Sequence, residues 1–250
     1  MERFASLVEK EINDKNQIFN IPPFSIIILI FGFITSTLCL YIFSELAEKV
    51  LANETIYLDH LINKFISSFY SGLLNIVMKL VTRTGSLVCL ATLSAITFIW
   101  LWFYKKDAWV NLFFFITVAG GGILNRLLKI FFHRTRPSLK PEIDAVNFSF
   151  PSGHAMGSLI FYGFIGYLII RSERKKISKI ISTIFLAGFI FMIGISRIYL
   201  NVHYATDVIA GFCAGTLWLV ICILALEFTN WYRKRKHLPN LDDEEVRPLR

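Results

Sequence analysis

The sequence lacks a polar region long enough to form a large soluble domain. Of its 250 residues 55% are hydrophobic, the mean hydropathy is +0.57, and the polar remainder consists of short loops and two tails. No small-residue cleavage site follows the first apolar stretch, so we interpret this stretch as a membrane anchor rather than a removed signal peptide. The composition therefore excludes an ordinary soluble domain of this size.

Cysteine is scarce as well, and internal repeats are missing. Because no CxxC pair is present, neither a disulfide framework nor a zinc site is indicated. The cysteines lie inside apolar stretches, where we interpret them as packed thiols: Cys39, Cys89, Cys213 and Cys222.

Apolar stretches of membrane length dominate what is present. About 20 apolar residues span a bilayer as a helix, and a helix satisfies the backbone hydrogen bonds that lipid cannot. We therefore predict an all-α fold, an integral membrane bundle of six transmembrane helices with an added interfacial amphipathic helix. The predicted spans are residues 24–44, 85–104, 108–132, 152–170, 178–200 and 205–228.

The amphipathic helix is predicted over residues 57–80, where apolar residues recur at helical spacing and polar ones lie opposite. It would cover the bundle, and guiding lipid is a second interpretation. The chain is accordingly divided into a cytoplasmic N-terminal segment (1–23), a six-helix membrane domain (24–228), and a charged, mobile cytoplasmic tail (229–250).

Basic residues outnumber acidic ones by 26 to 18, which gives a net charge of +8. If six helices alternate in direction, sixteen Lys and Arg fall on one side of the membrane and ten on the other. The positive-inside rule then places both termini in the cytoplasm. Because this rule accounts for the basic residues, including the RKRK run at 233–236, we expect no nucleic-acid partner.

A first polar stretch ends the third predicted span, in NRLLKIFFHRTRP. Lys129 and Arg136 are two helical turns apart if the helix continues that far, and Arg134 stands nearby. Pro137 would then end the helix. Considered alone, these cations are explained more simply by contacts with lipid headgroups.

A second polar stretch, PSGH at residues 151–154, begins the fourth span. Ser152 suits a helix N-cap, and Gly153 lets the backbone approach a ligand closely. The first N–H groups of a helix bind phosphate well, and His154 lies in that first turn. Packing at the helix start is the alternative.

A third polar stretch, GISRIYLNVHYATDV, connects the fifth and sixth spans. Arg197 precedes His203, and Asp207 follows one turn later if the sixth helix begins near His203. A carboxylate there can hold one imidazole nitrogen as a donor and leave the other free as a nucleophile. An interfacial salt bridge is the alternative.

Alternation of the spans places the three stretches together on the outer side. Among their side chains are the cations Lys129, Arg136 and Arg197, the histidines His154 and His203 and the carboxylate of Asp207, and they add a helix N-terminus. This set suits phosphoryl transfer, which depends mainly on positioning and charge stabilisation.

In order and spacing, the stretches resemble the three signature motifs of the type 2 phosphatidic acid phosphatase superfamily. The matching residues are Lys129 with Arg136-Pro137, then Pro151-Ser152-Gly153-His154, then Ser196-Arg197 with His203 and Asp207.

The resemblance implies a division of roles. His203 would attack phosphorus and become a phosphohistidine, Asp207 would orient it, and His154 would protonate the leaving oxygen. No metal and no cofactor are implied. The implied phosphate-binding residues are Lys129, Arg136, Ser152, Gly153 and Arg197.

We therefore expect a multi-pass phosphatase of the cell membrane that hydrolyses the phosphate monoester or diphosphate headgroup of a lipid on the extracytoplasmic side. Phosphatidylglycerophosphate, undecaprenyl diphosphate and phosphatidic acid are the candidate substrates. The alternatives are a membrane phosphatase for a soluble phosphate ester and a non-catalytic, anion-binding membrane protein. The expected partners are the lipid phosphate substrate and the bilayer, with no obligate protein partner.

Overall fold

The computed structural model describes residues 23–54, 56–137 and 148–236, and over these ranges it is helical, without strands. Six helices are long and apolar enough to cross a membrane, as predicted. A π-helical turn, Leu101–Lys105, directly follows the helix that ends at Trp100. In chain order the helices are α2 (Pro23–Leu51), α3 (Tyr57–Ser67), α4 (Gly72–Thr84), α5 (Leu87–Trp100), α6 (Ala108–Phe132), α8 (Gly153–Ile170), α9 (Lys176–Tyr199) and α10 (Ala205–Lys236).

The chain forms two compact units. Within the described ranges, the smaller unit comprises the start of α2, as far as Phe33, and the end of α10 from Leu224 onward. The larger unit, Ile34–Ile223, contains all three motif stretches.

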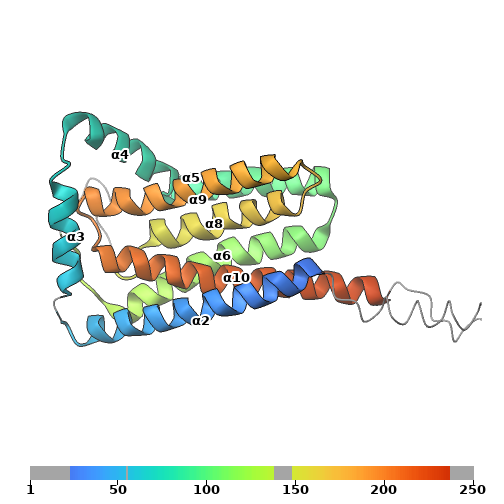
Figure 1. Ribbon diagram of the computed structural model, residues 1–250, viewed down its shortest axis with the longest axis horizontal. Coiled ribbons are helices and arrows are strands. Elements are labelled where there is room, and N and C mark those ends of the chain that lie inside the picture. The colour runs from blue at the N-terminus through green and yellow to red at the C-terminus, as the bar shows by residue number, and fades with distance from the viewer. Residues whose placement is uncertain (1–22, 55, 138–147, 237–250) are drawn as a thin grey trace, which may run out of the picture. The chain divides into compact units, whose positions relative to one another are not determined.

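In the larger unit α8 is the central helix. It packs against α9, α6 and α5, and Figure 1 shows it between α9 and α6. Half of its span is buried, a larger share than in any of the other described spans. Because its N-terminal turn is held by neighbours on several sides, α8 provides a rigid base for the PSGH stretch.

The prediction of one amphipathic helix over residues 57–80 is wrong in its extent, because two helices, α3 and α4, form there. Ser71 caps α4 by accepting a hydrogen bond from the Leu74 N–H at 3.2 Å. The Ser71 N–H donates to the Tyr199 hydroxyl of α9, also at 3.2 Å. The break is thus set by a local cap and a tertiary contact, while the apolar spacing continues through it. In Figure 1, α3 lies across one end of the bundle.

Two helix boundaries also differ from the predictions. Helix α6 ends at Phe132 and does not continue to Arg136, because His133 adopts a left-handed conformation with φ of 48°. Helix α10 extends to Lys236 and includes the RKRK run, beyond the predicted domain end at 228. The rest of the predicted tail and nearly all of the predicted N-terminal segment lie outside the described residues.

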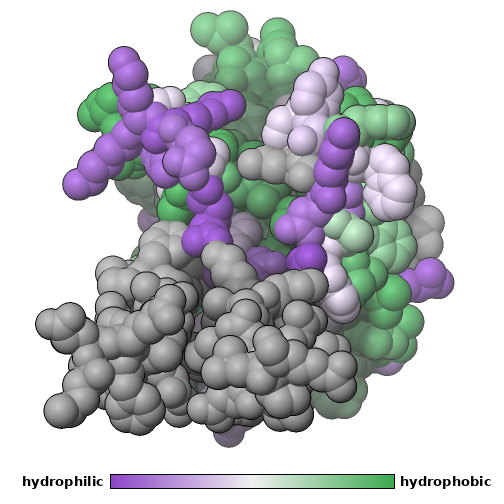
Figure 2. Space-filling view, turned by 90° about the vertical axis from the view of Figure 1, so that its right-hand side faces the viewer, coloured by the Kyte–Doolittle hydropathy of each residue, from purple (hydrophilic) through white to green (hydrophobic). Residues whose placement is uncertain are grey.

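The end of the larger unit away from α3 carries the connection between α8 and α9. Its exposed side chains include Arg171, Arg174 and Lys175. Figure 2 looks toward this end and shows hydrophilic side chains among hydrophobic ones. Some of the basic residues that the positive-inside rule assigned to the cytoplasmic side thus lie at the end of the larger unit opposite α3.

Candidate active site

The three motif stretches meet at the α3 end of the larger unit, where α6 and α9 end and α8 and α10 begin (Figure 1). The Ser152 N–H donates to the Asp207 carbonyl at 2.9 Å, which joins the start of α8 to that of α10. The structure therefore brings the residues predicted for the site together.

Lys129 reaches the site from a helix, and Arg136 reaches it from the loop that follows this helix. Lys129 lies in the last turn of α6, and its Nζ donates to the Phe148 carbonyl at 2.8 Å. Arg136 follows the end of α6, and its guanidinium donates to the Val202 carbonyl at 3.3 Å. Each cation is thus held against a loop that borders the site.

The start of α8 is built as the sequence predicted. Ser152 is the N-cap, fully buried, and its Oγ accepts a hydrogen bond from the Ala155 N–H at 3.5 Å. Gly153 packs closely on α6, because a Cβ at this position would lie 3.0 Å from Asn125 Oδ1 and 3.8 Å from Lys129 Cε. The α8 N-terminus and the Lys129 side chain are therefore adjacent, and both would attract an anion bound there.

Arg197 and His203 lie at the junction of α9 and α10. Arg197 is fully buried near the end of α9 and donates to the Thr82 hydroxyl of α4 at 2.8 Å. His203 lies in the turn before α10, is 2% exposed, and has its Nδ1 3.4 Å from Asp207 Oδ2. The predicted imidazole–carboxylate pair is present, although α10 begins only at Ala205.

The surroundings of His203 favour its neutral form. Burial lowers its pKa well below the ordinary value of 6.5, and the charges of Arg197, Lys129 and Arg136 lower it further. A hydrogen bond with the Ser149 backbone acts in the opposite direction. At neutral pH the ring therefore keeps a lone pair on one nitrogen, as a nucleophile requires.

A buried network around Arg134 was not predicted from the sequence. Arg134 donates to Asp207 Oδ1 at 2.6 Å and to Asp59 Oδ2 of α3 at 2.8 Å. Asp59 also accepts from the Thr206 N–H and hydroxyl, both at 2.9 Å. The Arg134 guanidinium lies 4.1 Å from the centre of the Tyr204 ring.

The charges in this network stabilise one another. Burial lowers the pKa of Arg134, but the neighbouring Asp207 and Asp59 carboxylates outweigh this effect and raise the pKa above its ordinary value. Asp59 is one of the polar residues of the predicted amphipathic stretch 57–80, and a polar residue there would be expected to face solvent. The residue is instead 7% exposed and connects α3 to the carboxylate that faces His203.

Helix α4 contributes cations that sequence reasoning also missed. A polar pocket of about 300 Å³ lies beside the site, and His154 and Arg197 are among its lining residues, whereas the buried His203 is not. Lys79 and Arg83 are four positions apart, about one helical turn, a spacing that could have indicated a shared face. The α4 and adjoining residues of the lining are Lys79, Thr82, Arg83 and Ser86.

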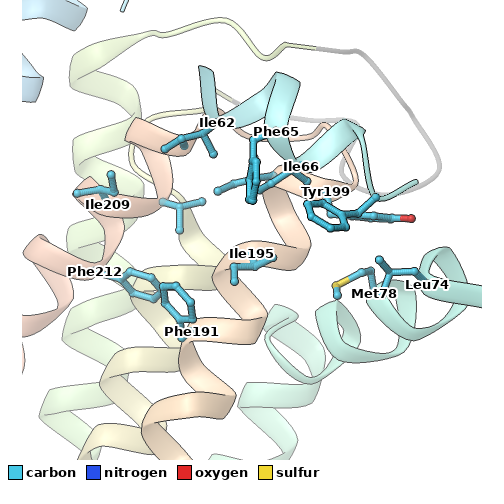
Figure 3. A pocket seen from close by; sticks show the side chains of 14 residues that line it. Ile62, Phe65, Ile66, Leu74, Met78, Phe191, Ile195, Tyr199, Ile209 and Phe212 are labelled. Carbon is cyan, nitrogen blue, oxygen red and sulfur yellow. The ribbon is translucent and has the colours of Figure 1, made fainter. Parts of the chain in front are cut away.

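An apolar pocket of about 430 Å³ lies between α3, α4, α9 and α10. Figure 3 shows side chains of α3, such as Ile62, and of α4, such as Met78, pointing toward those of α9 and α10. The lining includes Ile198, which follows Arg197 directly, and Ala205, two residues before Asp207. The apolar pocket is therefore lined by residues one or two positions from Arg197 and Asp207.

No group of three His, Cys, Asp or Glu side chains suited to hold a metal ion occurs among the residues that the structure describes. The arrangement offers instead a neutral imidazole backed by a carboxylate, a second histidine, three cations and a helix N-terminus. Such a set can bind a phosphoryl group and stabilise its transfer by charge.

Comparisons with known proteins agree with this chemistry. The sequence profile of the PAP2 superfamily matches residues 108–231. Phosphatidylglycerophosphatase B of Bacillus subtilis is 33% identical over 180 residues, which cover 70% of this chain and 86% of that protein. Lipid A 1-phosphatase of Rhizobium johnstonii is 30% identical over 118 residues, 43% of this chain and 44% of that protein.

A solved structure is similar to the fold. The crystal structure of a transmembrane PAP2-type phosphatidylglycerolphosphate phosphatase from Bacillus subtilis matches with a TM-score of 0.68 and 28% sequence identity. The match covers 86% of this chain and 99% of the crystallised one.

Proposed function

This chain belongs to the PAP2 superfamily and is a membrane lipid phosphatase, and we propose that it removes the terminal phosphate of a lipid headgroup through a phosphohistidine at His203. Phosphatidylglycerophosphate is the first candidate substrate, because a relative that the match covers to 86% of its length is named for that lipid. Undecaprenyl diphosphate and phosphatidic acid remain candidates.

The observation that carries the proposal is the setting of His203. Its Nδ1 faces the Asp207 carboxylate at 3.4 Å, and three cations act on the ring. A proton held on Nδ1 by the carboxylate leaves the Nε2 lone pair to attack phosphorus. The imidazolium that develops during the attack is stabilised by the same carboxylate.

The reaction then proceeds in two displacements. In the first, the Nε2–P bond forms while the P–O bond to the leaving group breaks, and His154 gives its proton to the leaving oxygen. In the second, water attacks phosphorus, His154 takes up the water proton, and the N–P bond breaks to release inorganic phosphate.

The phosphate oxygens have donors on several sides. Lys129, Arg136 and Arg197 supply cations, while Ser152 and the Gly153 backbone supply the start of α8. These groups would neutralise the charge on the transferred phosphoryl group, which is the main task in such a reaction.

The apolar pocket favours a lipid over a soluble phosphate ester. It is enclosed by helices that also contribute to the polar site, so an acyl or prenyl chain could lie there while the headgroup reaches the cations. This arrangement would also give α3 and α4 the lipid-guiding role that the sequence left open.

We further propose that the site faces the extracytoplasmic side and that both termini are cytoplasmic, as the charge asymmetry predicts. In a variant without native cysteines, Ser68→Cys on the turn after α3 should react with an impermeant thiol reagent in intact cells. Glu173→Cys, in the α8–α9 connection, should react only after the cells are opened. The reverse pattern would contradict this orientation.

The catalytic proposal is tested with purified protein in detergent and lipid phosphates as substrates. Wild type should release inorganic phosphate and, after a rapid acid-free quench, retain radioactive phosphate from labelled substrate. His203→Ala should do neither. The matched control is His60→Ala, which removes an exposed histidine of α3 and should retain both. A labelled phosphoenzyme in His203→Ala would exclude this residue as the nucleophile, and binding without turnover by wild type would favour the anion-binding alternative.

A further inference from the structure

Two cations on α4, Lys79 and Arg83, have no part in the three signature motifs. They lie one helical turn apart, both are exposed, and both line the polar pocket beside the site. Within the described residues, neither forms a salt bridge with an acidic side chain. A simple contact with bilayer headgroups would explain their exposure, but it would not explain why they share a pocket with His154 and Arg197.

The position of the two histidines indicates what this pocket receives. An in-line displacement at phosphorus places the leaving group opposite the attacking nitrogen. His203 is 2% exposed and does not line the pocket. His154 does line it, and it is the residue proposed to protonate the leaving oxygen. The part of the headgroup beyond the cleaved bond should therefore lie in this pocket.

The charge of the pocket then bears on the leaving group. If the substrate were phosphatidic acid, the leaving group would be a neutral diacylglycerol, which two further positive charges would not stabilise. If the headgroup carried a second phosphate on the leaving-group side of the cleaved bond, that phosphate would meet Lys79 and Arg83. The pocket volume of about 300 Å³ has room for a phosphate and a short linker.

We propose that Lys79 and Arg83 form a subsite for a second phosphate in the leaving group, so that this enzyme prefers lipids carrying two phosphates over simple lipid monophosphates. The inference rests on the proposed function. Two kinds of lipid share the required chemistry: a lipid diphosphate, in which one bridging oxygen joins the two phosphorus atoms, and a lipid whose phosphodiester is joined through glycerol to the terminal phosphate.

The test compares substrates that differ in the second phosphate. One pair is phosphatidylglycerophosphate and phosphatidic acid, and the other is undecaprenyl diphosphate and undecaprenyl phosphate. The full-length chain, purified in detergent, is assayed for kcat/KM on each lipid, and the ratio within each pair measures the preference. Lys79→Gln, Arg83→Gln and the double variant are compared with Lys64→Gln, which removes an exposed cation of α3 outside the pocket.

In wild type at least one ratio should favour the two-phosphate lipid. Each charge-assisted contact is expected to change the ratio by up to about tenfold, less where solvent screens it, so the double variant should lower the ratio by more than either single variant, at most about 100-fold. Lys64→Gln should leave the ratio unchanged. A fall in only one pair identifies the diphosphate or the glycerol-linked phosphate as the occupant.

Equal losses on all four lipids, or an unchanged ratio, would overturn the subsite. Equal losses would indicate general attraction of anionic lipid. Either outcome would leave the dependence on His203 intact, whereas failure of the proposed function would appear as phosphate release by His203→Ala. The two failures are therefore distinguishable.

Discussion

The leaving group of the substrate should separate the roles of the two histidines. His154 lies in the first turn of α8 and lines the polar pocket, whereas His203 is buried against Asp207. A lipid alkoxide is a poor leaving group and needs a proton as the P–O bond breaks. A nitrophenolate is a stable anion and needs little help. His154→Ala should therefore impair lipid phosphate hydrolysis much more than hydrolysis of p-nitrophenyl phosphate.

The expected size of the loss in lipid phosphate hydrolysis follows from the groups that His154→Ala retains. The three cations and the α8 N-terminus stay in place, so stabilisation of the phosphoryl group is preserved for both substrates. Only the proton donor is lost, and a positioned general acid typically contributes about 10²–10⁴-fold, or roughly 2.7–5.4 kcal/mol of barrier at 1.36 kcal/mol per tenfold. Because the ring lines a pocket and not the closed core, its removal should have little effect on folding.

The assay measures kcat/KM on a lipid monoester and on p-nitrophenyl phosphate for wild type and both variants. His154→Ala should lose most activity on the lipid and keep a larger share on the nitrophenyl ester. His203→Ala should lose both, because no nucleophile remains. Equal losses on the two substrates in His154→Ala would show that this histidine is not the general acid.

Three further predictions concern the same site. Arg134→Gln should lower kcat more than it raises KM and should reduce the thermal unfolding temperature, since removing one partner of a buried pair costs about 3–5 kcal/mol. Because the Arg134 side chain is 14% exposed, we expect a loss of stability at the lower end of this range. The control Arg126→Gln, at an exposed position of α6, should change neither the kinetics nor the unfolding temperature. The pKa of His203 is lowered by burial and by nearby cations, so as the pH falls His203 takes up a proton in the unfolded chain before it does so in the folded one. The free energy of unfolding should therefore decline below about pH 6.5, and an identical decline in His203→Gln would refute this. Hydrolysis of a lipid monoester should persist in chelator and be inhibited by vanadate, which can mimic five-coordinate phosphorus among the cations; a complete loss in chelator that magnesium restores would contradict it.

The membrane architecture could be predicted because its cause is local and repetitive. A stretch such as 108–132 must be helical in lipid whatever its neighbours are, and the structure gives the same bounds. Alternation of such spans brings the ends of α6 and α9 to the starts of α8 and α10, so the meeting of the three motif stretches also followed from the sequence. The helix limits that depend on single residues, such as the left-handed His133, did not.

The parts that could not be predicted depend on contacts between distant residues. Asp59 and Arg134 are 75 positions apart, and only the fold shows that they meet. The periodicity of residues 57–80 is continuous, so it could not reveal that Ser71 begins a new helix with support from Tyr199. Because that break was missed, the position of α4 beside the site was missed as well.

These distant contacts change the interpretation of the interfacial helices. A simple cover over the bundle would touch it through apolar side chains alone. Helix α3 instead places Asp59 in the network that holds one oxygen of Asp207 while the other faces His203. Helix α4 places the Thr82 hydroxyl on Arg197. Each helix thus fixes one charged residue of the site, and the same two helices enclose part of the apolar pocket. The groups that would hold the lipid chain and those that orient the phosphate-binding residues are therefore parts of the same two short helices, so a change that shifts either helix should alter chemistry and lipid binding together.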